Sequence, residues 1–256
     1  MFFRNLTLFR FPEGIDKRFK KLDEQLAEHA LRPCGPLELQ TRGWVSPYGR
    51  GEDMFSIEHG QQALLALGGE DKLLPTAIIN QHIAEKVEEL EKQRGRPVGA
   101  RERRKLKDDA LTELLPRALA RPSRLAGYLD IPKGWVVVDT SSRKAAEGFV
   151  SALRNALGSF PATGLEPEES PRALMTEWMI EGKLPTGFAL GDECELKDPA
   201  DNGAIVRCRR QDLGADEMRE HLSSGKQVTQ LALTFEERMR FVLDETLTVR
   251  KFKLLD

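Results

Sequence analysis

The segment from Pro75 to Pro116 constrains the fold more than any other part of the sequence. Residues 76–93 carry a stripe of apolar side chains at helical spacing, and residues 100–115 form a second helical stretch. The Gly-Arg-Pro-Val-Gly link at 95–99 concentrates residues that interrupt a helix. Proline at position 75 suits the first turn of a helix, and the proline at 116 ends the second helix. The sequence therefore predicts a helical hairpin that projects from the rest of the chain.

Short strand patterns flank this hairpin, each bounded by residues that favour turns. They fall at residues 2–11, 37–45, 54–58, 63–67, 125–131 and 135–140, with helical patterns at 15–31 and 145–157. Ser141 or Ser142 is suited to cap the second of these helices. After a Pro- and Glu-rich connection, a further mixture of strand and helix patterns continues to the end of the sequence. The order of elements predicts an α+β fold with antiparallel sheets and packed helices.

These patterns predict three parts. Residues 1–74 and 116–160 are expected to form a central α+β domain, and residues 75–115 the projecting helical hairpin, or tip. Residues 161–256 are expected to form a second α+β domain, the base, after the connection at 160–171.

Composition limits the classes of function. The chain carries 39 Lys and Arg residues against 41 Asp and Glu, a net charge of −2, so nucleic-acid binding has to come from local clusters of cations. Cys34, Cys194 and Cys208 are odd in number and widely spaced, which predicts buried thiols rather than disulfides or a zinc site. No apolar run approaches the ~20 residues that span a membrane, and the start lacks the order of a signal peptide. We therefore expect a cytoplasmic protein with no bound metal and no membrane contact.

The strongest charge feature lies at residues 92–107, at the tip of the predicted hairpin and along its second helix. Glu102 is the single acid in this stretch, although an acidic run at 85–91 precedes it. Lys and Arg recognise phosphate through charge and bidentate hydrogen bonds, without reading bases. A solvated helix face beside the acidic run explains the same pattern, and the residues alone leave both interpretations open. The cations are Lys92, Arg94, Arg96, Arg101, Arg103, Arg104, Lys105 and Lys107.

Two smaller basic sets lie further along the chain, and each is either a phosphate contact or a surface ladder. The first directly follows the hairpin, where two prolines restrict the backbone, and comprises Arg117, Arg121 and Arg124. The second lies on a predicted strand, where alternate residues share one face, and comprises Arg207, Arg209 and Arg210, followed by Gln211.

A metal-dependent nuclease is one alternative function. Glu193 and Glu195 lie on a predicted strand, with Lys197 two residues further on. Two carboxylates that share a magnesium ion suit phosphodiester hydrolysis. However, a Glu-x-Lys pattern is common by chance, and such sites need a further acid earlier in the fold. The four histidines are scattered without metal-ligand spacing, and no glycine-rich nucleotide-binding motif occurs.

Many short motifs along the chain resemble those of a known protein family, independently of the patterns described above. They include Phe3-Arg4-Asn5-Leu6, Gly43-Trp44-Val45, Lys72-Leu73-Leu74-Pro75, Leu114-Leu115-Pro116-Arg117-Ala118, Met175-Thr176-Glu177-Trp178, Asp192-Glu193-Cys194-Glu195-Leu196, Arg209-Arg210-Gln211-Asp212-Leu213 and Gly225-Lys226-Gln227-Val228-Thr229. In these motifs, which follow one order over essentially the whole chain, the sequence resembles the RdgC family of recombination-associated DNA-binding proteins.

The resemblance implies a ring-shaped homodimer that encircles duplex DNA and binds it without sequence preference. Such proteins modulate RecA-dependent recombination by occupying the DNA in competition with RecA-type recombinases, are nucleoid-associated, and are not enzymes and need no cofactor. The hairpin, with Arg117 and Leu119, would form one dimer contact, and Gln211 would lie at the other. The residues expected to contact DNA are the eight cations of 92–107 together with Arg117, Arg121, Arg209, Arg210, Gln211 and Lys226.

Two features depart from the family pattern. Family members usually carry a bulky aromatic residue where this chain has Leu119, so we expect a weaker or differently packed hairpin contact. Members also usually continue past the strand that ends here near Leu255, with an acidic, partly helical tail. A third function stays open beside DNA binding and nuclease activity, namely a protein-binding recombination regulator whose arginines serve salt bridges.

Overall fold

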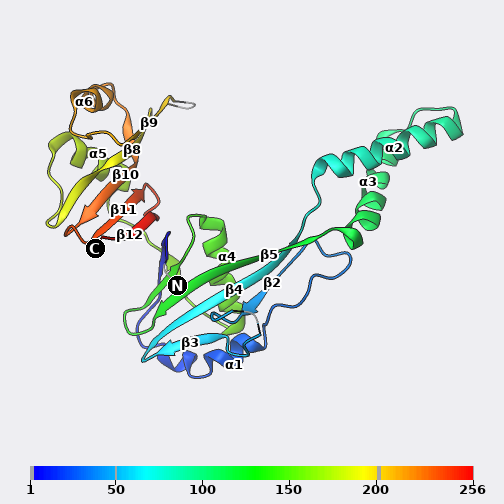
Figure 1. Cartoon of the computed structure of the whole chain (residues 1–256), viewed down its shortest axis with the longest axis horizontal. Helices are drawn as coiled ribbons and strands as arrows, with labels where there is room; N and C mark the ends of the chain where they lie inside the picture. The colour runs from blue at the N-terminus through cyan, green and yellow to red at the C-terminus, as the bar shows by residue number, and fades with distance from the viewer. Residues whose placement is uncertain (1–2, 50, 201–202, 256) are drawn as a thin grey trace. The chain divides into compact units, whose positions relative to one another are not determined.

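The computed structural model describes residues 3–49, 51–200 and 203–255, and Figure 1 shows the path of the chain. Two compact units emerge: one comprises Met1–Leu22, Ile57–Leu64 and Leu125–Asp256, and the other Asp23–Ser56 and Leu65–Arg124. The division into a central domain, a tip and a base remains a prediction. Phe2, at the start of the first expected strand, lies outside the described residues.

Seven strands of the described chain form one sheet, in the order β2-β4-β5-β6-β1-β7, with β3 paired to β4. The pairings β1–β6, β1–β7, β2–β4 and β5–β6 are antiparallel, as the α+β prediction requires. The strands are β1 (Thr7–Arg10), β2 (Gln40–Val45), β3 (Ser56–His59), β4 (Gln62–Lys72), β5 (Ala120–Asp130), β6 (Trp135–Val138) and β7 (Thr163–Gly164).

Helix α4 (Arg143–Ala156) buries one face against this sheet. The Ser142 hydroxyl accepts a hydrogen bond from the Ala145 amide (3.3 Å), which confirms the expected cap. The Phe149 ring is fully buried and lies over Gly127 of β5, where a Cβ atom would come within 2.2 Å of the ring. A side chain at position 127 would therefore displace the aromatic ring from the core.

The helix expected at 15–31 is much shorter in the structure. A 3-10 turn at Asp16–Phe19 precedes α1 (Leu22–Ala27), and the chain after α1 turns to run beside β2 through the Ala30–Trp44 bridge. The apolar periodicity still marks the buried face correctly, because Phe19, Leu22 and Leu26 are buried. Within α1, the Asp23 carboxylate accepts hydrogen bonds from the Phe55 and Ser56 amides, which ties the helix to the chain before β3.

A second sheet holds five strands of the described chain in the order β12-β11-β10-β8-β9, all antiparallel to their neighbours. Val249, the first residue of β12, exchanges backbone hydrogen bonds of 2.7 and 3.0 Å with Leu6, the residue that precedes β1. The strands are β8 (Phe188–Lys197), β9 (Ile205–Arg209), β10 (Gln227–Phe235), β11 (Met239–Asp244) and β12 (Val249–Leu254).

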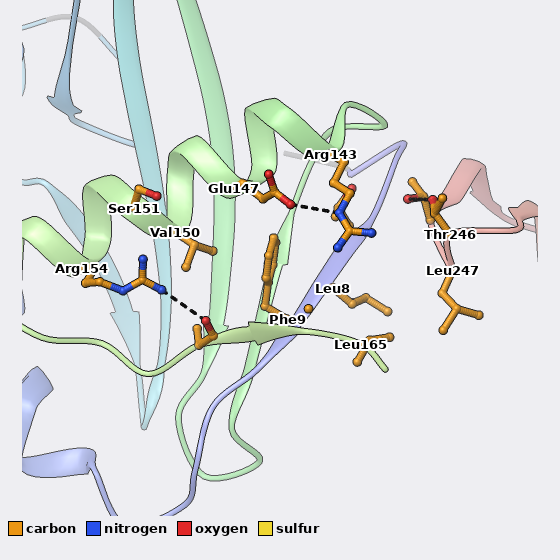
Figure 2. A pocket seen from close by; sticks show the side chains of 14 residues that line it. Leu8, Phe9, Arg143, Glu147, Val150, Ser151, Arg154, Leu165, Thr246 and Leu247 are labelled. Carbon is orange, nitrogen blue, oxygen red and sulfur yellow. Dashed lines mark hydrogen bonds and ion pairs between the residues drawn. The ribbon is translucent and has the colours of Figure 1, made fainter. Parts of the chain in front are cut away.

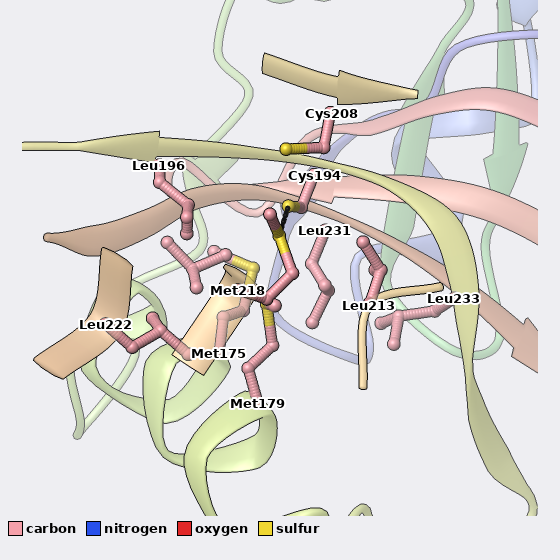
Figure 3. Close-up of a cluster of buried hydrophobic side chains, with 11 residues drawn as sticks. Met175, Met179, Cys194, Leu196, Cys208, Leu213, Met218, Leu222, Leu231 and Leu233 are labelled. Atoms are coloured by element: carbon pink, nitrogen blue, oxygen red, sulfur yellow. Dashed lines mark hydrogen bonds between the residues drawn. The ribbon is translucent and has the colours of Figure 1, made fainter. Parts of the chain in front are cut away.

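Helices α5 (Pro171–Glu181) and α6 (Asp216–Ser223) cover one face of this second sheet. Their side chains interdigitate with alternate strand residues in a dry cluster, shown in Figure 3. Flexible methionines fill the irregular space between helix and twisted sheet. The buried cluster comprises Met175, Met179, Cys194, Leu196, Cys208, Leu213, Met218, Leu222, Val228, Leu231 and Leu233. Cys194 and Cys208 are free thiols within it, as the cysteine count predicts, whereas the free thiol of Cys34 is only partly buried and its predicted burial was wrong.

The helices of the predicted hairpin are confirmed almost to the residue. Helix α2 spans Thr76–Arg94 and α3 spans Ala100–Leu114, and Gly95 takes the left-handed conformation (φ 63°) that ends α2. Glu113 of α3 accepts hydrogen bonds from His82 (3.0 Å) and Lys86 (2.5 Å) of α2, so the two helices pack against each other. Projection of this pair from the sheet remains a prediction.

Strand β5 begins five residues earlier than the pattern indicates, at Ala120 instead of residue 125. Arg121 and Arg124 consequently lie on a strand rather than in a turn after the hairpin. Proline at 122 hides this part of the strand in the sequence, because proline lacks the donor that a sheet uses. The structure tolerates it since β6 pairs only with Gly127–Asp130 and leaves the first half of β5 unpaired on that side.

The contact between α4 and β5 yields a stability prediction. We expect Gly127→Ala to lower the free energy of unfolding by about 1–3 kcal/mol, because the added methyl group overpacks against the Phe149 ring. Gly148→Ala is the matched control, since position 148 lies on an exposed helix face with no heavy atom near the new Cβ. That control is expected to raise stability by about 0.5–1 kcal/mol. Urea titration of both variants measures the two changes, and an unaffected Gly127→Ala variant would show that the α4 packing is wrong.

Candidate nucleic-acid interface

Five cations of α3 carry no ion pair to any residue that the structure describes. All five side chains are exposed to solvent. Because they occur at seven consecutive helical positions, they surround most of the circumference of the first half of α3. An exposed cation without a carboxylate partner is available to form charge-assisted hydrogen bonds with an external anion. The five residues are Arg101, Arg103, Arg104, Lys105 and Lys107.

The other three cations of the 92–107 cluster have carboxylate partners. Lys92 Nζ lies 2.6 Å from Glu88 on the preceding turn of α2. Arg94 and Arg96 both donate to Glu102, at 2.9 and 2.8 Å. The sequence indicated one basic cluster of eight residues, whereas the structure separates it into an unpaired set on α3 and a partly neutralised set at the link between the helices.

Glu102 is the acid that organises this link. Its carboxylate accepts hydrogen bonds from Arg96 and from the backbone amide of Gly99, the residue that precedes α3. The hydrogen bond from Arg96, followed by that from Gly99, lowers the pKa of the Glu102 carboxyl from 4.5 to about 2. The carboxylate therefore stays charged and holds the start of α3 throughout the neutral range.

The base of the hairpin carries an exposed apolar surface. Leu119 is 77% exposed, and its carbonyl accepts a hydrogen bond from the Leu73 amide (2.8 Å), so the two exposed leucines are neighbours. The adjacent Lys72 amide donates to the Leu39 carbonyl, so the backbone of a third exposed leucine lies nearby. Large exposed apolar side chains gathered in one region are typical of a contact between protein molecules. We call Leu39, Leu73 and Leu119 the leucine patch.

The predicted cations near this patch have different environments. Arg117 and Arg121 are exposed and carry no ion pair within the described part of the chain. Arg124 instead donates to the Ser46 carbonyl, so it supports the fold locally. The proposed roles of Arg117 and Arg121 in DNA or dimer contacts remain predictions.

The predicted residues of the second sheet also separate into two groups. Arg209 and Arg210 are exposed without a carboxylate partner among the residues described. Gln211, by contrast, donates to Glu217 (2.6 Å) through its side-chain amide and to the Asp192 carbonyl (3.1 Å) through its backbone N–H. Lys226 donates to the Ser224 hydroxyl (3.0 Å).

The sequence interpretation missed cations that meet Arg209 and Arg210 in space. Arg240 of β11 and Lys251 and Lys253 of β12 line a hollow of about 540 Å³ together with them. The available signal was the density of Lys and Arg in the last strand pattern, Val249–Leu254. It could not show that these strands share a surface with β9, which lies at the other edge of the sheet.

The two carboxylates of the nuclease alternative are both held by cations. Glu195 accepts hydrogen bonds from Arg207 (2.6 Å) and from the Thr229 hydroxyl (3.0 Å), and Glu193 pairs with Lys251 (2.6 Å). Partial burial raises the pKa of the Glu195 carboxyl, but the hydrogen bonds from Arg207 and Thr229 outweigh burial and leave that pKa lowered. In the described residues, no group of three or more His, Cys, Asp or Glu side chains is placed to hold a metal ion.

A separate pocket of about 340 Å³ lies beside α4 and the turn between β11 and β12, as Figure 2 shows. Its two arginines are already engaged by the fold. Arg143 donates to Glu147 (2.9 Å), and Arg154 donates to the carbonyls of Phe160 (3.0 Å) and Ala162 (3.3 Å). The pocket therefore offers little free charge to an anion.

No described helix combines the length and the apolar character needed to cross a membrane.

The Glu102 contacts predict how the hairpin responds to acid. The folded pKa of about 2 lies below the ordinary 4.5, so the stabilising contribution is complete above pH 4.5 and is lost as the pH falls towards 2. After correction for the intrinsic exchange rate, which itself depends on pH, we expect the protection of the first amides of α3 to fall over that range. In Glu102→Gln the same amides should exchange faster at neutral pH and show a smaller change on acidification. An identical pH profile for the two proteins would contradict the assigned role of Glu102.

Comparisons with known proteins agree with this arrangement of motifs. The family model described as "Putative exonuclease, RdgC" matches residues 1–256. A protein of Stenotrophomonas maltophilia (strain R551-3) named "Recombination-associated protein RdgC" is 49% identical over 257 residues, covering 100% of this chain and 85% of that protein. Proteins with the same name from Xanthomonas campestris pv. campestris (strain B100) and Xanthomonas axonopodis pv. citri (strain 306) are each 48% identical, covering 100% of this chain and 84% and 85% of their own lengths. The chain therefore belongs to the RdgC family of recombination-associated proteins.

Proposed function

We propose that this protein binds duplex DNA without sequence preference, as a ring-shaped homodimer that encircles the DNA and thereby modulates RecA-dependent recombination. The family relationship supports a role in recombination. Within that role, we infer a non-enzymatic, cofactor-free binding protein that acts on the nucleoid in the cytoplasm by competing with a recombinase for DNA.

The unpaired cations of α3 are the observation that carries the proposal. Some cations of this chain form ion pairs with its own carboxylates, as Arg94 and Arg96 illustrate. Leaving Arg101, Arg104 and Lys105 unpaired on one helix costs self-repulsion, which a polyanion relieves. Contacts of this kind bind the phosphate backbone, which every DNA sequence shares, so they supply affinity without base preference.

The leucine patch supports association of two copies. In an isologous dimer, the same surface of each copy meets its counterpart, so one exposed apolar patch serves both partners. The patch adjoins Arg117, which family resemblance assigns to the hairpin contact together with Leu119. A closed ring holds DNA topologically, and only its inner wall needs cations. The mild net charge of the chain is therefore compatible with DNA binding.

The pairing of the acidic residues disfavours the nuclease alternative. Catalysis by two carboxylates requires that both are free to share a metal ion, whereas Lys251 and Arg207 occupy Glu193 and Glu195. A magnesium-activated enzyme would shorten end-labelled duplex DNA and lose that activity in Glu195→Ala. The third possibility, a regulator that binds only proteins, requires recombinase binding in the absence of DNA.

Charge reversal on α3 tests DNA binding directly. We expect Arg101→Glu, Arg103→Glu and Arg104→Glu together to weaken duplex binding equally for unrelated sequences. The slope of log K against log salt should become shallower by about 3, since each lost phosphate contact removes ~0.9. Fluorescence anisotropy with two unrelated duplexes, each titrated with salt, measures both quantities.

Glu85→Lys with Glu89→Lys serves as the control on the neighbouring helix. These exposed carboxylates belong to α2, and their reversal alters the local charge without removing a cation of α3. The control should bind DNA at least as tightly as the wild type. If both variants lose affinity to the same degree, α3 is not the phosphate-binding surface. Tight preference for one of the two duplexes would refute binding without base readout.

Encirclement predicts a difference between circular and linear DNA. A closed ring leaves linear DNA by sliding off an end but stays on a covalently closed circle, so a salt wash should release the protein from linear DNA first. Cutting the washed circle at one site should then release the retained protein.

Light scattering of the free protein should give the mass of two chains, and Leu119→Asp should shift that mass towards one chain. A persistent single chain in the wild type would exclude the ring.

A further inference from the structure

The second sheet has one covered face and one open face. Helices α5 and α6 pack on the face that carries Cys194, Leu196 and the other buried residues of the cluster in Figure 3. Side chains alternate along a strand, so the intervening residues of β8 and β9 project from the opposite face. That open face carries Glu193 and Glu195 of β8 and Arg207 and Arg209 of β9.

Cations outnumber acids in the hollow of this open face. Arg209, Arg210, Arg240, Lys251 and Lys253 line it against only two carboxylates, those of Asp192 and Glu193. Ion pairs join Arg240 to Asp192 and Lys251 to Glu193. Five cations less two carboxylates leave a charge of +3. The three residual cations, Arg209, Arg210 and Lys253, have no carboxylate partner among the described residues.

Irregular backbone brings several of these cations to one surface. Strand β12 pairs with β11 through Val242–Arg250 and Arg240–Lys253, so it carries one extra residue between these two pairs. Arg250 and Lys253 are three positions apart and would face opposite sides of a regular strand. The bulge places both on the open face, where Arg250 lines an adjoining hollow of about 380 Å³ that also contains Arg209 and Lys251.

Two of the cations also occupy strained backbone conformations. Arg210 and Lys251 have φ angles of 54° and 53°, in the left-handed region that favours glycine. Neither residue is needed for the apolar core, which lies on the other face of the sheet. Strained positions of this kind commonly occur where a side chain serves a binding function.

We propose that the open face of the second sheet is a phosphate-binding surface for the duplex DNA of the proposed function, contacted by Arg209, Arg210 and Lys253. The inference rests on that proposed function and adds Lys253, with the ion-paired Arg240 and Lys251 behind it, to the DNA contacts. Arg209 and Arg210 follow one edge strand and Lys253 belongs to the other edge strand. Cations contributed by both edge strands suit the successive phosphates of a nucleic-acid backbone.

Neutralisation of unpaired cations provides the first test. Arg209→Ser with Lys253→Ser removes two cations without leaving a carboxylate unpaired, so the fold should survive. We expect the slope of log K against log salt for duplex DNA to become shallower by about 2. The control is Lys183→Ser with Arg219→Ser, which removes two exposed cations on the helix-covered side of the same sheet, each in a surface ion pair of 3.6 Å. That control should retain the wild-type slope.

The outcomes separate this inference from the proposed function. If the wild type binds duplex DNA and the α3 reversal weakens it, but Arg209→Ser with Lys253→Ser changes nothing, only the inference about the open face is overturned. If the wild type itself fails to bind DNA, the proposed function fails. Equal losses in the open-face variant and in its control would show a general charge effect and would also overturn the inference.

Chemical protection provides a second test that does not depend on variants. Acetylation of lysines with an amine-reactive ester, followed by mass spectrometry, should label Lys253 and Lys183 in the free protein. A short duplex should protect Lys253 and leave Lys183 labelled.

Arg210→Gly complements this measurement, because glycine suits the φ of 54°. Its melting temperature should be unchanged or higher while DNA affinity falls, whereas unchanged affinity or unprotected Lys253 would overturn the inference.

Discussion

The pairing of cations with carboxylates is the constraint on which the functional surfaces of this protein depend. The chain holds nearly equal numbers of the two charge types, so its affinity for a polyanion is determined by which cations lack an internal partner. Glu102 pairs with two arginines at the hairpin link, and Asp192 and Glu193 each hold one cation of the second sheet. Cations without such a partner lie close together on α3 and on the open face of that sheet. These two surfaces therefore carry local positive charge although the chain is nearly neutral.

The same pairing bears on the two names that relatives of this chain carry. The family model is described as an exonuclease, whereas the similar proteins are named for their association with recombination. Two strand carboxylates in the right spacing resemble a metal site in the sequence. In the folded chain, however, the cross-strand partner Arg207 and the β12 residue Lys251 occupy them. Carboxylates engaged in this way strengthen a sheet and orient neighbouring cations, and on this ground we propose a binding surface rather than hydrolysis.

The second sheet shows how packing on one face controls chemistry on the other. The methionine- and leucine-rich cluster fixes the alternation of β8, β9 and β10, because a shift by one residue would expose the whole apolar set. Once that register is set, the polar residues that alternate with the apolar ones lie on the open face. Besides the charged residues, Phe241, Val242 and Leu255 line the hollow on that face.

The sequence by itself determined the α+β class, the two hairpin helices, the Ser142 cap and the burial of Cys194 and Cys208. Each follows from local periodicity or residue chemistry that acts within a few positions of the chain. It also located the basic segment at 92–107, but composition could not reveal that three of its eight cations form ion pairs with Glu88 and Glu102. The early start of β5 through Pro122 and the gathering of Arg209 with Lys253 were decided only by the tertiary structure. Strand pairing joins residues distant in the sequence, and a single extra residue in β12 reverses which face its side chains occupy, so neither outcome is encoded in any local pattern.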